Sequence, residues 1–82
     1  MTKEEIFEKL KGKIAEQLDI EDQNTITLES SFRKDLGADS LDTYELLYAI
    51  ESEMNAKVED EEANQFTTVN DVVEFIYKEQ NK

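Results

Sequence analysis

The chain has no cysteine and no histidine among its 82 residues. These absences remove the usual general base, the thiol nucleophile and the softer metal ligands together. Catalysis by this chain alone is therefore not expected. The lack of cysteine also means that no disulfide supports the fold, which suits a reducing compartment.

Long apolar runs, linkers and targeting signals are also missing. No stretch approaches the roughly 20 apolar residues of a membrane span. The N-terminus, Met1-Thr2-Lys3-Glu4-Glu5, has no apolar h-region and is too acidic for a transit peptide. Proline is absent, and no linker or internal repeat divides the chain. We expect one domain over residues 1–82, in a soluble, cytoplasmic and monomeric protein without membrane insertion.

Basic side chains are scarce, since 9 lysines and arginines stand against 21 acidic residues and the net charge is -12. Such a chain is a poor partner for nucleic acid and a good one for proteins with Lys/Arg patches. The plainer interpretation is that acidity only keeps a small protein in solution. Residues 39–65, one third of the chain, hold nine acidic side chains and one lysine, which is two thirds of the net charge. This concentration favours a docking surface.

Apolar residues recur at helical spacing in three parts of the chain. The first predicted helix covers residues 3–18 and begins with a capping box of Thr2 and Glu5. Its polar face, which includes Lys9, Lys11 and Lys13, is expected to be solvated.

The second predicted helix covers residues 40–54, and one or two helical turns fit residues 59–66. Thr67 or Thr68 caps a final helix with Asp71 in its first turn. Residues 78–82 are expected to fray. The fold class is therefore all-α, a small helical bundle of three main helices plus a short helix between the second and the last.

Residues 19–39 form a long predicted loop, which Phe32 and Leu36 anchor. A loop of this length in a small domain is often functional. An EF-hand starting at Asp19 would need glycine at its sixth position and glutamate at its twelfth, but Asn24 and Ser30 stand there. No metal site is therefore predicted.

The second helix has two apolar stripes. Thr43, Leu46, Leu47, Ile50 and Met54 form one stripe, which is expected to face the core. Leu41, Tyr44 and Tyr48 lie on nearly the opposite side, bordered by Glu45 and Glu51. A small domain has one core, so the second stripe is expected to be an exposed surface for protein contacts. The alternative is that the two tyrosines cover a loop.

Ser40 stands at the start of the second helix, and Gly37 supplies backbone freedom before it. Spacing alone favours a simple N-cap. A nucleophile would need a base, but the chain has neither histidine nor a Ser-x-x-Lys pattern. A functional Ser40 would therefore be modified by another enzyme. A phosphodiester suits a helix N-terminus, although Asp39 and Asp42 oppose it by charge repulsion.

The run Phe32-Arg33-Lys34-Asp35-Leu36-Gly37-Ala38-Asp39-Ser40-Leu41-Asp42-Thr43 resembles the attachment motif of bacterial acyl carrier proteins of dissociated (type II) fatty-acid synthesis. Residues 45–51, 60–63 and 67–73 are similar to the second, third and fourth helices of that family. The resemblance implies that Ser40 carries 4′-phosphopantetheine, a phosphoprotein linkage made by holo-acyl-carrier-protein synthase. The arm would bring the thiol that the chain lacks.

The resemblance also implies a role in lipid metabolism, because the arm would carry growing acyl chains between fatty-acid synthesis enzymes and acyltransferases with basic patches. The expected partner-binding residues are Asp39, Leu41, Asp42, Tyr44, Glu45, Tyr48 and Glu51. The expected lining of an acyl pocket is Phe32, Leu46, Leu47, Ile50, Val58, Ala63, Phe66 and Val72, all of which would also suit an ordinary core.

Two positions depart from the family pattern. Tyr44 and Tyr48 stand where aliphatic residues are common, and Glu59 replaces a frequent proline, which predicts a more mobile loop. Two alternatives stay open. One is a carrier for a specialised pathway, such as polyketide, lipid A-type or D-alanyl transfer, and the other is an acidic helical module that only binds a protein.

Overall fold

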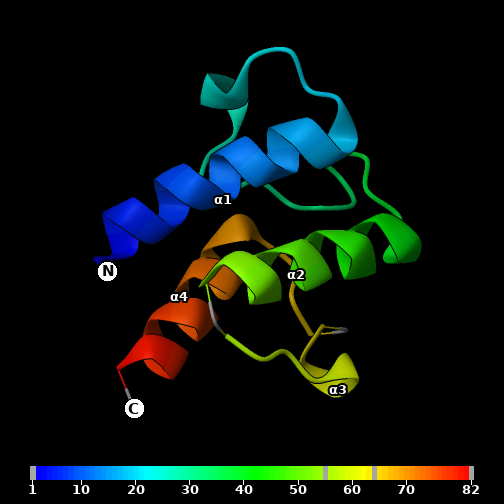
Figure 1. Ribbon diagram of the computed structural model, residues 1–82. Helices are drawn as coiled ribbons and strands as arrows, with labels where there is room; N and C mark the ends of the chain where they lie inside the picture. Colours follow the sequence, from blue (N-terminus) through cyan, green and yellow to red (C-terminus); the bar gives the residue numbers. More distant parts are fainter. Residues whose placement is uncertain (1, 55, 64, 82) are drawn as a thin grey trace.

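The computed structural model describes residues 2–54, 56–63 and 65–81, and at positions 40 and 60 it describes the backbone alone. These residues form the helices α1 (Lys3–Leu18), η1 (Gln23–Thr25, a 3-10 turn), α2 (Ser40–Met54), α3 (Asp60–Ala63) and α4 (Val69–Gln80). Figure 1 shows α1 lying across α2, with α4 beside them and α3 at the edge of the molecule. The described part contains no strand beyond an isolated bridge between Ser31 and Thr68. The predicted all-α bundle is confirmed.

The first helix begins and ends at the predicted residues because of its caps. The Glu5 backbone N–H donates to Thr2 Oγ1 at 3.1 Å, and the Thr2 N–H donates to Glu5 Oε1 at 2.9 Å. At the other end Asp19 adopts the left-handed conformation, with φ of 57°. This turn lets the Ile20 N–H reach the carbonyl of Ala15 at 2.8 Å and stops the helix.

The last helix has a similar capping box. The Asp71 N–H donates to Thr68 Oγ1 at 3.4 Å, while Asp71 Oδ2 accepts from the N–H groups of Thr67 (2.9 Å) and Thr68 (3.1 Å). These backbone donors hold the pKa of the Asp71 carboxyl below its ordinary value of 3.8. Of the two predicted caps, Thr68 is the one that the helix uses.

The core lies where α1 meets α2 and α4. The first stripe of α2 is buried there as predicted, with Ile50 inaccessible to solvent and only Thr43 half-buried. The other helices bury one residue per turn against it. The fully buried side chains include Ile6, Leu10, Ile14, Val69, Val72 and Ile76.

Lys11 is not on the solvated face where the sequence placed it, because only 8% of the residue is exposed. Its aliphatic stem is covered, while its ammonium pairs with Glu8 at 3.1 Å and lies 4.9 Å from the centre of the Phe7 ring. A lysine can bury its methylenes and still place its charge at the surface. Helical periodicity cannot detect this, since it treats the side chain as one polar unit.

The long loop is held to the start of α4 by backbone hydrogen bonds. The N–H groups of Val69 and Asn70 donate to the carbonyls of Ser30 (3.0 Å) and Leu28 (2.9 Å). The Phe32 N–H donates to the Thr67 carbonyl at 3.0 Å, and the Phe32 ring is buried as predicted. The loop therefore satisfies N–H donors that the first turn of a helix leaves free.

The C-terminal helix continues further than the sequence indicated. It runs to Gln80, although fraying was expected from residue 78. Gln80 is half-buried, and its Nε2 donates to the carbonyl of Met54 at 3.2 Å, which ties the end of α4 to the end of α2. This contact between distant segments explains the difference. The last residue of the predicted tail, Lys82, lies outside the described residues.

Candidate functional site

The loop before α2 is closed by its own hydrogen bonds. The Ser31 N–H donates to Asp35 Oδ2 at 2.7 Å, and the Ala38 N–H donates to the Phe32 carbonyl at 2.8 Å. Between them Gly37 adopts a φ of 68°, which is the backbone freedom expected of it. Ala38 is buried at the end of this turn, and its burial fixes the position of the backbone just before α2.

The N-cap of α2 is Asp39. Its Oδ1 accepts from the Asp42 N–H at 2.9 Å, and Asp42 Oδ2 accepts from the Asp39 N–H at 3.3 Å, which is a reciprocal capping box. Ser40 is therefore the first helical residue, and the expectation that it caps the helix is wrong. The N–H groups of Asp42 and Thr43 both donate to Asp39, to its Oδ1 and its carbonyl oxygen. The side chain of Ser40 itself lies outside the described part of the structure.

A pocket of about 310 Å³ lies beside the first turn of α2. One wall is the loop segment 31–34, and the other contains Thr43 and Tyr44 of α2 with Ala63 and Phe66 from the α3 region. Phe66 is backed by Phe75 of α4, with ring centroids 5.4 Å apart. The complete lining is Ser31, Phe32, Arg33, Lys34, Thr43, Tyr44, Ala63, Phe66 and Thr67.

The structure brings only part of the expected acyl-pocket lining together. Phe32, Ala63 and Phe66 line this pocket. The remaining expected residues are core or near-core: Leu46, Leu47, Ile50 and Val72 are buried, and Val58 is half-buried against the core. The sequence did not predict that Arg33, Lys34, Thr43, Tyr44 and the two other hydroxyl-bearing residues belong to the lining, although Tyr44 was expected to bind partners or to cover a loop. No periodic signal marks them, because they meet only where the loop crosses the helix.

The second stripe of α2 is exposed in part. Leu41 and Tyr48 are 64% and 63% exposed, as expected for a contact surface. Tyr44 is half-buried and forms part of the pocket wall opposite the loop. The alternative of a ring that covers a loop therefore describes Tyr44, and the contact-surface interpretation describes Tyr48.

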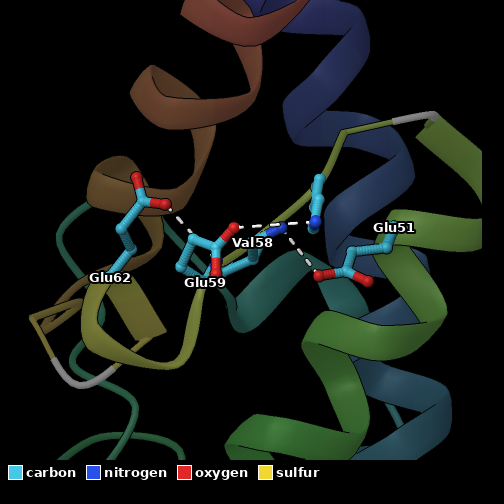
Figure 2. A network of polar contacts seen from close by, with 5 residues as sticks. Glu51, Val58, Glu59 and Glu62 are labelled. Atoms are coloured by element: carbon cyan, nitrogen blue, oxygen red, sulfur yellow. Dashed lines mark hydrogen bonds and ion pairs between the residues drawn. The ribbon is translucent and has the colours of Figure 1, made fainter.

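The acidic residues expected to bind partners all accept hydrogen bonds within the chain. Asp39 and Asp42 form the capping box, and Glu45 Oε2 accepts from Gln17 Nε2 at 2.8 Å. Glu51 Oε1 accepts from the Val58 N–H at 2.7 Å, a contact that Figure 2 shows between α2 and the following loop. These carboxylates stabilise the fold as well as supplying charge.

The site has the chemistry to accept a phosphorylated arm but not to catalyse. The two cationic residues of the pocket, Arg33 and Lys34, suit a phosphodiester, and the aromatic and methyl groups suit an apolar chain. Among the residues that the structure describes, no group of three or more acidic side chains is placed to hold a metal ion. No helix in that part is long and apolar enough to cross a membrane.

Comparison with known proteins agrees with this chemistry. Residues 8–76 match the family described as a phosphopantetheine attachment site, so the chain belongs to that family. Proteins of this kind carry 4′-phosphopantetheine, which supplies the thiol for a thioester when it is attached.

The particular relatives are acyl carrier proteins. The acyl carrier protein of Treponema denticola is 54% identical over 94% of this chain and 97% of its own length, and that of Treponema pallidum is 58% identical over 89% and 92%. The crystal structure of an acyl carrier protein from Thermotoga maritima matches with a TM-score of 0.84 and 28% identity, over 99% of this chain and 93% of that one. This chain is likewise an acyl carrier and not an enzyme, and these matches favour the carrier over an acidic module that only binds a protein.

Proposed function

We propose that the whole chain is one carrier domain and that the Ser40 hydroxyl is its attachment point. The capping box carries this proposal, because the side chains of Asp39 and Asp42 stabilise the start of α2 and the helix does not depend on a serine cap. The pocket lies within one helical turn, where an attached arm would reach it.

Attachment by holo-acyl-carrier-protein synthase would use coenzyme A as the donor. The serine oxygen bonds to the phosphorus next to the pantetheine, the pyrophosphate bond breaks, and adenosine 3′,5′-bisphosphate leaves. The hydroxyl proton passes to a base of the transferase, since this chain has no histidine. The product is a phosphodiester on Ser40 that ends in a free thiol.

Intact mass spectrometry tests the attachment point. After incubation with coenzyme A and a phosphopantetheinyl transferase, the chain should gain the mass of one arm. Ser40→Ala should gain none, while Ser52→Ala, which changes an exposed serine on the same helix, should be loaded normally. An unmodified wild type, or a loaded Ser40→Ala, would contradict the proposal.

We further propose that the pocket shelters part of the acyl chain. Phe32, Ala63 and Phe66 offer apolar surface, and burial of each methylene contributes about 0.8 kcal/mol. Thermal unfolding of the loaded protein should rise in temperature from the free thiol to butyryl, hexanoyl and octanoyl thioesters. A melting temperature that does not change with chain length would count against shelter in the pocket.

The surface around α2 supports a role between fatty-acid synthesis enzymes. We propose that the cytoplasmic monomer presents Leu41 and Tyr48, ringed by the acidic residues named above, to enzymes and acyltransferases with basic patches. Each contact would be weak, because exposed charges give fast association more than tight binding.

A further inference from the structure

One of the carboxylates that are proposed to bind partners, that of Glu51, also holds the loop between α2 and α3. Glu51, in the fourth turn of α2, accepts a hydrogen bond from the Val58 N–H at 2.7 Å, and both residues are half-buried. Segment 56–58 makes no backbone-to-backbone hydrogen bond with other described residues. The first residue of this segment, Ala56, is held by its burial in the core. At the last residue, Val58, the loop is held by the hydrogen bond to Glu51.

From Val58 a chain of hydrogen bonds leads to α3, as Figure 2 shows. The Glu59 N–H donates to Glu62 Oε1 at 3.3 Å, and the Glu59 carbonyl accepts from the Ala63 N–H at 3.0 Å. A proline at position 59 could not donate the first of these bonds. The glutamate that replaces the family's frequent proline therefore fixes α3 in a different way, and the sequence alone indicated only a mobile loop.

The same chain of bonds ends at the pocket. The Ala63 carbonyl accepts from the Phe66 N–H at 3.4 Å, and both residues line the pocket opposite the loop segment 31–34. Besides the direct packing of α3 against α2, the Glu51 carboxylate thus ties the wall of the pocket to α2 by a hydrogen bond. Helix α3 itself is a single turn of four residues. Short segments of this kind open locally at low cost when an anchoring bond is lost.

We propose that Glu51 is a positioning residue that links docking to the pocket: a lysine or arginine of a partner that engages its carboxylate releases Val58 and loosens the wall formed by Ala63 and Phe66. The inference rests on the proposed function for what the pocket contains. The competition is physical, because a carboxylate oxygen that turns to a partner's cation cannot keep the same geometry toward a backbone N–H. The neighbouring cation, Lys57, pairs with Glu59, whose Oε1 lies 3.7 Å from its ammonium.

Amide hydrogen exchange on the unmodified chain tests the link directly. In Glu51→Ala, amides in 56–63 should exchange about tenfold faster or more, and in Glu51→Gln by a smaller factor, because the amide oxygen still accepts without charge. The amides of residues 6–14 in α1 should be unchanged. Glu53→Ala is the matched control, since it removes the same charge from the same helix. The Glu53 carboxylate pairs with Lys13 of α1 at 2.9 Å and not with the loop.

A cationic probe separates coupling from a purely structural role. An octalysine peptide should speed exchange in 56–63 of the wild type and of Glu53→Ala, and should have no such effect on Glu51→Ala. Equal acceleration in all three proteins, or Glu51→Ala exchanging like Glu53→Ala, would overturn the proposal. If Glu51→Ala does not fold, exchange in residues 56–63 of Glu51→Gln is measured with and without the peptide and decides the question in the same way.

The effect on the attached acyl chain is measured with the octanoyl thioester of the loaded protein. Hydroxylamine should cleave this thioester several-fold faster in Glu51→Gln than in the wild type or Glu53→Ala. Equal cleavage rates with altered exchange would show that the octanoyl chain does not depend on this wall, which overturns the link to the pocket. Failure of Ser40 to accept the arm would instead refute the proposed function, while the exchange experiment still decides the role of Glu51.

Discussion

At the scale of single residues, the start of α2 separates two roles that one serine could have combined. Asp39 caps the helix and Ser40 begins it, so the cap and the proposed attachment point are neighbouring residues. The distinction is a matter of one position along the chain. Serine, aspartate and asparagine are all favoured caps, so residue preference alone cannot choose between them.

This division predicts a difference in stability between two neighbouring variants. Asp39→Ala should lose about 1 kcal/mol of unfolding free energy, because an N-cap acceptor is removed, and Asp39→Asn should lose less. Ser40→Ala should change it by less than about 0.5 kcal/mol, since alanine is well suited to a first helical turn. Urea denaturation followed by circular dichroism measures all three. If Ser40→Ala proved as costly as Asp39→Ala, the serine would be the cap after all.

At the scale of elements, the caps explain why the helices could be predicted so closely. The start of α1 was predicted correctly because Thr2 and Glu5 form a local signal that needs no tertiary contact. The lining of the pocket was predicted only in part, since Thr43 and Tyr44 meet the 31–34 segment through a crossing that no local pattern encodes. The extension of α4 to Gln80 was missed for the same reason, as it depends on a contact with Met54.

The cap of α4 predicts a specific pH dependence. The pKa of Asp71 lies below 3.8 in the folded protein because the Thr67 and Thr68 N–H groups donate to its carboxylate. A depressed carboxyl pKa contributes stability that is fully present above its ordinary value and is lost as pH falls through the folded value. The stability difference between wild type and Asp71→Asn should therefore be constant above about pH 6, roughly two pH units above the ordinary carboxyl pKa. It should shrink as the pH falls below 3.8.

Denaturation of both proteins across this acidic range gives the measurement. The difference between them is the useful quantity, because lowering the pH also relieves the repulsion of a chain with net charge -12. A difference that is the same at every pH would show that the Asp71 charge contributes nothing to the cap.

At the scale of the whole molecule, charge and packing are arranged around the same helix. Helix α2 packs against both α1 and α3, and the segment from Asp39 to Gln65 that contains it holds two thirds of the net negative charge. Figure 1 shows α3 at the edge of the molecule next to α2. The acidic region is thus both the proposed surface for partners and the side on which the pocket wall is attached.

This arrangement predicts that docking is sensitive to salt. Affinity for holo-acyl-carrier-protein synthase should fall about tenfold or more as salt rises from roughly 0.05 to 0.5 M, because screening shortens to a few ångströms. Glu45→Lys should weaken binding and flatten the salt dependence. Glu4→Lys, the same charge change on an exposed residue of α1, should do neither. Surface plasmon resonance at several salt concentrations measures both effects, and salt-independent binding would exclude an electrostatic docking face.

The capping box at the start of α2 has a consequence for cells that make both forms of the protein. Because Asp39 and not Ser40 caps the helix, a chain without the serine should keep its fold and the proposed docking face. Such a chain would occupy the transferase and the synthesis enzymes without ever accepting cargo. The structure therefore predicts that Ser40→Ala, when abundant, is a decoy that slows lipid synthesis in the presence of the normal protein and is not merely inactive.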